Sequence, residues 1–170
     1  DELGHILDGS ARLRGVEVFS HTEAEMVVTA GGRVCGVSCR GASSPLGAEL
    51  VVNCAGAWAG EVSVPGGEVR VRPVKGQMLC LDAGLLGTCG PLRTVYSHHA
   101  YLVPRGDGRI IVGTTVEDRG YDKTVEAGAV AKLIEGAVKL CPGLSSARFV
   151  EAWAGLRPRR DAEPRPAGSH

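Results

Sequence analysis

The sequence lacks several patterns that would point to a function directly. No apolar run approaches the roughly 20 residues that a helix needs to span a bilayer, and no basic segment followed by an apolar stretch opens the chain, so we expect neither a membrane helix nor a signal peptide. Lys and Arg together number 19, as do Asp and Glu, and this balance argues against a nucleic-acid-binding surface. No Gly-x-Gly-x-x-Gly motif occurs, so the usual phosphate-binding turn of a dinucleotide-binding domain is absent from this sequence.

Cysteine is present, but not in a pattern that binds metal. The six cysteines form no Cys-x-x-Cys pair, and their spacing fits neither a zinc site nor a small disulfide framework. We therefore expect no metal site. Unpaired cysteine behaves as a small hydrophobe, so we expect free, buried thiols and a reducing, cytoplasmic location.

Length and composition bound the architecture. The chain has 170 residues, enough for one domain or two small lobes, and aromatics make up only 4%, so the core must consist of Val, Leu, Ile and Ala. A glycine-rich stretch, Val64–Gly67, indicates a lobe boundary. We assign a first lobe to residues 1–62, a second to 63–158, and a mobile tail, rich in Pro and Arg, to 159–170.

The first lobe reads as a helix followed by strands. Apolar residues at helical spacing predict a helix over Asp1–Arg14. Runs rich in β-branched residues predict strands over Val16–Phe19, Met26–Thr29, Arg33–Cys39 and Glu49–Cys54. Gly31-Gly32 predicts a hairpin between two of them, because both turn positions can adopt a positive φ.

The second lobe reads as a sheet with one main helix. Strands are expected over Glu68–Arg72, Met78–Leu81, Arg93–Tyr96, Tyr101–Arg105, Arg109–Gly113 and Phe149–Trp153. Lys75-Gly76-Gln77 reads as a turn between strands. A helix is predicted over Val125–Leu140, capped by Thr124 and ended by Pro142-Gly143. The expected fold class is α+β, with a mixed or antiparallel sheet and one packed helix.

A few residues of the second lobe have side chains suited to binding or catalysis. The planar guanidinium of arginine suits a carboxylate, and Pro158 forces Arg157 toward an extended backbone that can aim its side chain into a cavity. Taken alone, Arg157 reads more readily as a solvated residue and Tyr101 as a half-buried packing residue. His98 and His99 could act as acid, base or metal ligands, but adjacent strand residues point to opposite faces and do not readily share one metal.

Acidic and small residues give weaker signals. Asp82, Asp118 and Asp122 read as solvated loop acids, and no carboxylate pair has a spacing that suits acid–base catalysis. The run Ala55-Gly56-Ala57 permits close approach either by a cofactor or by another backbone, and the residues alone do not decide between them.

Certain short segments follow one another in a recognisable order. They are Val51–Trp58, Val71–Met78, Tyr101–Arg105, Val112–Asp118 and Glu151–Pro158. Each is weak alone, but in this order and spacing they resemble the glycine oxidase branch of the D-amino-acid oxidase family of FAD enzymes. The resemblance runs from about Leu3 to Pro158, and it implies a partial FAD-binding lobe followed by a substrate-binding lobe.

The resemblance also implies roles for particular residues. Tyr101 and Arg157 would bind the carboxylate of a small amino acid or amine substrate, with His99 near the same pocket. The residues expected at FAD are Ala24, near the adenine side, and Ala55, Gly56, Ala57, Trp58 and Gly155. The implied reaction is hydride transfer from the amine-bearing carbon to the flavin, followed by hydrolysis of the imine and reoxidation of the flavin by oxygen to give peroxide.

The substrate and the extent of the enzyme are open at this point. Glycine, sarcosine, another secondary amine or a D-amino acid would each fit the resemblance. The family's glycine-rich start and its segment after Leu156-Arg157-Pro158 do not occur in the sequence, so we expect a central piece of such an enzyme, inactive alone. A second hypothesis, from a different class, is a non-enzymatic α+β module that binds a small carboxylate or self-associates.

Overall fold

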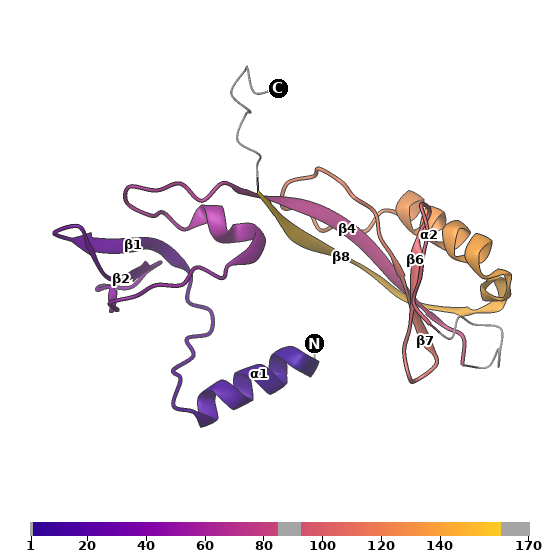
Figure 1. The fold of residues 1–170 in the computed structure, drawn as a ribbon, viewed down its shortest axis with the longest axis horizontal. Coiled ribbons are helices and arrows are strands. Elements are labelled where there is room, and N and C mark those ends of the chain that lie inside the picture. Colours follow the sequence, from indigo (N-terminus) through magenta and orange to yellow (C-terminus); the bar gives the residue numbers. More distant parts are fainter. Residues whose placement is uncertain (1, 85–92, 161–170) are drawn as a thin grey trace, which may run out of the picture. The chain divides into compact units, whose positions relative to one another are not determined.

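The computed structural model describes residues 2–84 and 93–160 (Figure 1). The chain forms two compact units: unit 1 comprises Asp1–Asn53 and Glu61–Val69, and unit 2 comprises Cys54–Gly60 and Arg70–His170. The division into lobes 1–62 and 63–158 stays a prediction. It differs from these units because residues 54–60 belong to unit 2 and residues 63–69 belong to unit 1. Within the described residues, no helix has the length and apolar character needed to cross a membrane.

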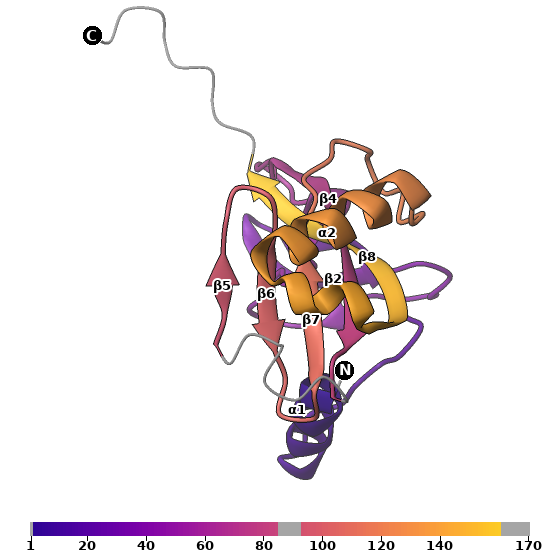
Figure 2. The same cartoon turned by 90° about the vertical axis from the view of Figure 1, so that its right-hand side faces the viewer.

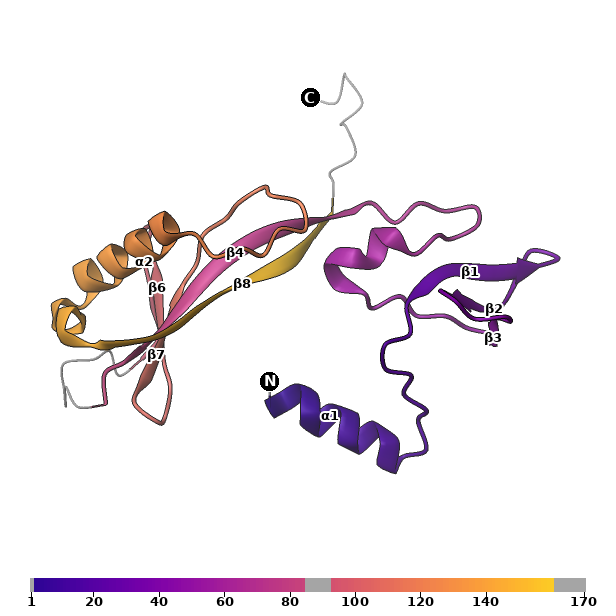
Figure 3. The ribbon, with the colours of Figure 1, turned by 180° about the vertical axis from the view of Figure 1, so that it is seen from behind.

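Unit 1 contains one helix and a small sheet (Figure 3). Helix α1 (Glu2–Leu13) confirms the helix that the apolar spacing predicts. Strands β1 (Ala24–Ala30), β2 (Arg33–Cys39) and β3 (Leu46–Gly47) form a three-stranded antiparallel sheet in the order β1-β2-β3. Gly31 and Gly32 both have positive φ, 57° and 78°, and Ala30 pairs with Arg33, so the predicted hairpin is confirmed.

Two strands predicted for unit 1 are wrong. Neither Val16–Phe19 nor Glu49–Cys54 is assigned as a strand. Leu50 and Val52 are 79% and 72% exposed. A β-branched run becomes a strand only where a neighbouring strand supplies pairing and a packed face, and propensity alone does not provide either.

Unit 2 is built on a five-stranded antiparallel sheet covered by one helix, which confirms the α+β class (Figures 1 and 2). The sheet order is β5-β6-β7-β4-β8. The elements, in chain order, are η1 (Gly56–Glu61), β4 (Val71–Asp82), β5 (Val95–Tyr96), β6 (Tyr101–Pro104), β7 (Arg109–Gly113), α2 (Ala127–Leu140), η3 (Pro142–Ser146) and β8 (Arg148–Arg160).

The core of unit 2 lies between the sheet and α2. Alternate strand residues point to opposite faces, so Leu79 and Leu81 of β4 point to the face that carries the helix. The core consists of Leu79, Leu81, Ala83, Ala100, Leu102, Ile110, Val112, Leu133, Ala137 and Leu144. Figure 2 shows α2 lying across β6, β7, β4 and β8. No aromatic residue belongs to this cluster among the described residues, as the low aromatic content predicts.

Two sequence predictions for the sheet of unit 2 need correction. Lys75-Gly76-Gln77 is not a turn but the middle of β4, paired with Leu156, Gly155 and Ala154 of β8. Strand β8 pairs with β4 continuously from Val71 to Cys80, so the strand continues through this segment. Arg159 and Arg160 end β8 and pair with Arg72 and Val71, so the tail does not start at Arg159. Residues 161–170 lie outside the described residues.

The cysteines are free thiols where the structure describes them, but not all are buried. Cys39 and Cys80 are buried, and burial raises the pKa of the Cys80 thiol. Cys35 and Cys54 are exposed, so the expectation of buried thiols is wrong for these two. Cys89 lies outside the described residues.

Helix α2 begins differently from the prediction. Its N-cap residue is Glu126, not Thr124, and no side chain of the cap residue bonds to the helix. The backbone N–H of Glu126 instead donates to Oε1 of Gln77 at 2.8 Å. A buried side chain of β4 therefore satisfies one of the amides that a helix leaves unpaired at its start.

Replacement of Gln77 by leucine should lower the free energy of unfolding by about 1–3 kcal/mol, because the Glu126 N–H and the Glu117 carboxylate both lose a buried partner. Urea denaturation measures the change. Thr124→Ala is the control and should cost clearly less, since α2 takes no cap bond from that side chain. Equal losses for the two variants would contradict this account of the helix start.

Candidate active site

The sheet of unit 2 has a second face, opposite α2, and Tyr101 lies on it. Tyr101 pairs with Gly113, which pairs with Met78, which pairs with Trp153, so these residues form one row across four strands. The Tyr101 hydroxyl donates a hydrogen bond to Met78 Sδ at 3.2 Å. A Cβ at Gly113 would lie 2.5 Å from the Tyr101 hydroxyl, so the ring occupies space that only glycine leaves open.

Arg157 reaches the same face from β8. It pairs with Val74, and its Nη2 donates to the backbone oxygen of Thr115 at 2.8 Å. A Cβ at Gly76 would lie 2.7 Å from Nη2, so the guanidinium lies over Gly76. Arg157 is exposed, and the remaining N–H donors of its guanidinium can therefore reach a ligand.

The structure brings Tyr101 and Arg157 together. The hydroxyl of Tyr101 contacts Met78, and the guanidinium of Arg157 covers Gly76. Met78 and Gly76 are two residues apart on β4, which is about 7 Å along a strand, and both point to the same face. We call Tyr101 and Arg157 the carboxylate pair, after the substrate carboxylate that the resemblance leads us to expect between them.

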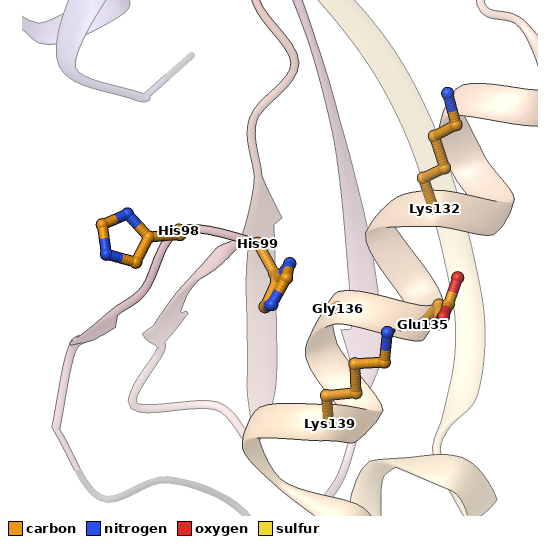
Figure 4. Close-up of a pocket in the computed structure, with 6 residues that line it drawn as sticks. All are labelled: His98, His99, Lys132, Glu135, Gly136 and Lys139. Atoms are coloured by element: carbon orange, nitrogen blue, oxygen red, sulfur yellow. Dashed lines mark ion pairs between the residues drawn. The ribbon is translucent and has the colours of Figure 1, made fainter.

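His99 does not lie with the carboxylate pair. Its side chain points toward α2 and lines a shallow pocket there, whereas His98 points away from the helix (Figure 4). The pocket is lined by His98, His99, Lys132, Glu135, Gly136 and Lys139. Tyr101 faces the other side of the sheet, so this structure gives no contact between His99 and Tyr101. The expected role of His99 at the substrate stays a prediction. The described residues contain no group of His, Cys, Asp or Glu side chains that could hold a metal ion.

The segment expected along FAD is attached to unit 2 by Tyr121. Gly56, Ala57 and Trp58 lie in η1. The Trp58 ring stacks on the Tyr121 ring, with centroids 5.8 Å apart and planes inclined by 22°. The Tyr121 hydroxyl donates to the backbone oxygen of Ala57 at 3.3 Å. This contact explains why residues 54–60 belong to unit 2.

Two glycines among the residues expected at the cofactor have free space beside their backbone, as close approach by a flat ring system requires. A Cβ at Gly56 or at Gly155 would meet no atom within 4 Å, so a ligand can approach both backbones closely. Trp58 is 45% exposed and offers an aromatic surface. These residues fit a flavin. Ala24 lies in unit 1, at the start of β1, and its expected place at FAD stays a prediction.

A polar cluster lies on the helix side of β4, where sequence reasoning missed it. The side chains of Lys75 and Gln77 are fully buried. Lys75 Nζ is 3.4 Å from Asp122 Oδ2 and 3.8 Å from Glu117 Oε2. Glu117 Oε1 accepts hydrogen bonds from Gln77 Nε2 at 2.8 Å and from Thr115 Oγ1 at 2.5 Å. We call Lys75, Gln77, Thr115, Glu117 and Asp122 the polar cluster.

The backbone joins the same residues. Lys75 and Glu117 exchange two N–H···O bonds of 2.9 Å, and Gln77 N donates to Thr115 Oγ1 at 2.8 Å. The first part of the β7–α2 loop, residues 114–126, thus runs beside β4 as a short extra strand. One signal for the cluster is present in the sequence: Lys75 and Gln77 alternate with Val74, Gly76 and Met78, as side chains of one strand face do.

The carboxylates of the polar cluster are ionised at neutral pH. Hydrogen bonds from Thr124 and a contact with Lys75 lower the pKa of Asp122 to about 2. Burial raises the pKa of Glu117, but hydrogen bonds from Thr115 and Gln77 and the charge of Lys75 outweigh it, so the pKa lies below its usual value. Each of the three acids predicted to be solvated forms an ion pair: Asp82 with Arg148, Asp118 with Arg72, and Asp122 with Lys75. The side chain of Asp118 is nonetheless 75% exposed.

Comparison with known proteins decides the family. Residues 6–168 match the model of the family DAO, described as FAD dependent oxidoreductase. This chain belongs to the DAO family. The resemblance inferred from the short motifs is thereby confirmed.

Individual relatives cover most of this chain. It is 41% identical over 150 residues to the glycine oxidase of Pseudomonas putida, covering 86% of this chain and 39% of the relative. It is 36% identical over 152 residues to the hydrogen cyanide synthase subunit HcnC of Pseudomonas protegens, covering 87% of this chain and 35% of the relative. The crystal structure of glycine oxidase from Geobacillus kaustophilus matches with a TM-score of 0.77 and 27% identity, over 89% of this chain and 40% of that one. This DAO-family chain thus spans 35–40% of the length of these proteins.

Acid should weaken the fold through the polar cluster. The pKa of Asp122 is about 2 in the folded chain, below the ordinary value of about 4, so its contribution to stability is complete above about pH 4 and is lost as the pH falls toward 2. Thermal melts between pH 6 and pH 2 measure this loss. Asp122→Asn should flatten the dependence, and Asp122→Glu should retain more of it. A pH profile of Asp122→Asn that coincides with the wild type would contradict the ion pair.

Proposed function

We propose that this chain carries the substrate-binding part of an FAD-dependent oxidase that acts on a small amino acid, with glycine as the first candidate. The observation that carries the proposal is the carboxylate pair, in which a tyrosine hydroxyl and a guanidinium lie over Met78 and Gly76 on the open face of one sheet. Membership of the DAO family supports the redox chemistry, and the similarity to glycine oxidases supports the substrate.

Each member of the pair has a defined task. Arg157 would donate hydrogen bonds to the substrate carboxylate from its forked N–H groups, and its bond to the Thr115 carbonyl fixes the guanidinium before the substrate arrives. Tyr101 would donate its hydroxyl to the same carboxylate in place of the weak bond to Met78 sulfur. Gly76 and Gly113 lack side chains, so the two larger residues and a ligand fit over the backbone.

The cofactor would lie along Ala55–Trp58 and beside Gly155, where the backbone is open. Bound FAD supplies the oxidant, since it accepts a hydride from the amine-bearing carbon. The chain's own residues bind and orient the substrate, and the carboxylate pair holds the amino acid by the group that does not react. This division of tasks needs no side-chain base.

The carboxylate pair does not by itself separate related substrates. Tyr101 and Arg157 recognise only the carboxylate, so sarcosine or a D-amino acid would be bound by the same contacts. Family membership favours the oxidase over a carboxylate-binding module without redox chemistry. A cytoplasmic location and self-association stay predictions.

Arg157→Ala should raise the Michaelis constant for glycine about tenfold to a hundredfold, because a charged hydrogen bond contributes ~1.5–3 kcal/mol. Tyr101→Phe should raise it less. The assay uses the natural gene product that contains this chain, loaded with FAD, and follows peroxide formation. Arg159→Ala, two residues along the same strand, is the matched control and should leave the constant unchanged.

Gly76→Ala extends this test without removing a charge. The added Cβ would lie 2.7 Å from Nη2 of Arg157 and from Oγ1 of Thr114, so the guanidinium must move. The Michaelis constant should rise as for Arg157→Ala. An unchanged constant in Arg157→Ala would refute the carboxylate assignment.

A further inference from the structure

One loop touches both halves of the proposed site. The β7–α2 loop, residues 114–126, contacts Arg157 through the backbone oxygen of Thr115. The same loop makes a second contact through Tyr121, whose ring stacks on Trp58 and whose hydroxyl donates to the backbone oxygen of Ala57. The substrate side and the expected cofactor side therefore rest on a single segment.

Lys75 holds this loop at two points. Its ammonium lies 3.8 Å from Oε2 of Glu117 and 3.4 Å from Oδ2 of Asp122, while its side chain is fully buried. Glu117 in turn accepts a hydrogen bond from Thr115, and Asp122 directly follows Tyr121 in the chain. Each of the two carboxylates that pair with Lys75 thus lies next to one functional contact: Glu117 beside Thr115, which contacts Arg157, and Asp122 beside Tyr121, which contacts Trp58.

The other attachments of the loop are weaker or more exposed. Arg72 pairs with Asp118 and Arg119 with Glu126, and both pairs are substantially open to solvent, where ion pairs contribute little. Gln77 and the Lys75 backbone hold residues 115–117, but Lys75 reaches Asp122 as well. A buried ammonium without its carboxylates would be costly, so Lys75 and the two acids keep the loop folded together.

We propose that Lys75 is a positioning residue that joins carboxylate binding at Arg157 to cofactor binding at Ala57 and Trp58. This inference rests on the proposed function. Lys75 touches neither ligand and acts only through the loop. Because both contacts lie on one loop, a ligand that orders the loop at one end lowers the cost of ordering it at the other, and the coupling acts equally in both directions.

The first experiment needs no cofactor. Hydrogen exchange of the purified chain, read by mass spectrometry, should show faster exchange over residues 113–122 in Lys75→Met than in the wild type. Lys75→Arg should restore part of the protection, because it keeps the charge. Lys123→Met, a change at an exposed lysine of the same loop, should have no effect. Unchanged exchange in Lys75→Met would overturn the proposal.

The second experiment uses the natural gene product that contains this chain, with FAD. Lys75→Met should weaken FAD binding and raise the Michaelis constant for glycine together, each by about fivefold or more, the lower end of typical coupling between sites. Arg157→Ala removes a substrate contact directly, so it should raise the Michaelis constant far more than it weakens FAD binding. A change in only one of the two quantities in Lys75→Met would overturn the proposal.

Failure of the Lys75 inference can be told apart from misfolding of the variant and from failure of the proposed function. If Lys75→Met fails to fold, Asp122→Asn replaces it, since Asp122 is nearly half exposed and Lys75 keeps Glu117 as a partner. It should loosen the Tyr121 end of the loop and weaken FAD binding, and unchanged affinity would contradict the inference. If the wild type neither binds FAD nor oxidises glycine, the proposed function fails, while the exchange experiment still decides whether Lys75 holds the loop.

Discussion

The burial of one lysine organises the functional half of this molecule. Lys75 lies in β4 with no exposed surface, and its charge requires the two carboxylates of Glu117 and Asp122. That requirement fixes the path of the β7–α2 loop beside β4. The loop then presents a carbonyl to Arg157 and an aromatic ring to Trp58, so the geometry of the candidate site follows from the ion pairs beneath it.

Because alternate residues of β4 point to opposite faces, its structural side chains lie on one face of the sheet and the floor of the proposed binding site lies on the other. On one side its residues are polar at the start and apolar further on, so Lys75 and Gln77 hold the loop and helix while Leu79 and Leu81 form the core. On the other side Gly76 and Met78 leave a low surface over which Arg157 and Tyr101 extend. One strand therefore carries both the structural ion pairs and the floor of the proposed binding site, and the β7–α2 loop contacts residues on both of its faces.

Much of the fold could be predicted from the sequence, because the hairpins and both helices carry local signals. Gly31-Gly32 and the apolar spacing of α2 are sufficient for their elements. The failures have a common cause: pairing partners far away in the chain decide them. Val16–Phe19 and Glu49–Cys54 have strand propensity without a partner strand, whereas Lys75-Gly76-Gln77 has turn-like composition but is held in a strand by β8.

The family and the carboxylate pair were accessible from motifs, but the polar cluster was not, since its members come from separate segments and only the fold makes them neighbours. His99 is the opposite case: it is close to Tyr101 in the sequence, but its side chain lies on the α2 side of the sheet, away from Tyr101.

The central claim is that the open face beside Arg157 and Tyr101 receives a carboxylate next to a flavin. The most direct measurement is the visible absorption spectrum of the natural gene product that contains this chain, recorded after incubation with FAD and desalting, and then during titration with glycolate, a small carboxylate without an amine. The account predicts that the protein retains the yellow flavin and that glycolate shifts its absorption bands in a saturable way. A colourless protein, or flavin bands that glycolate leaves unmoved, would contradict it.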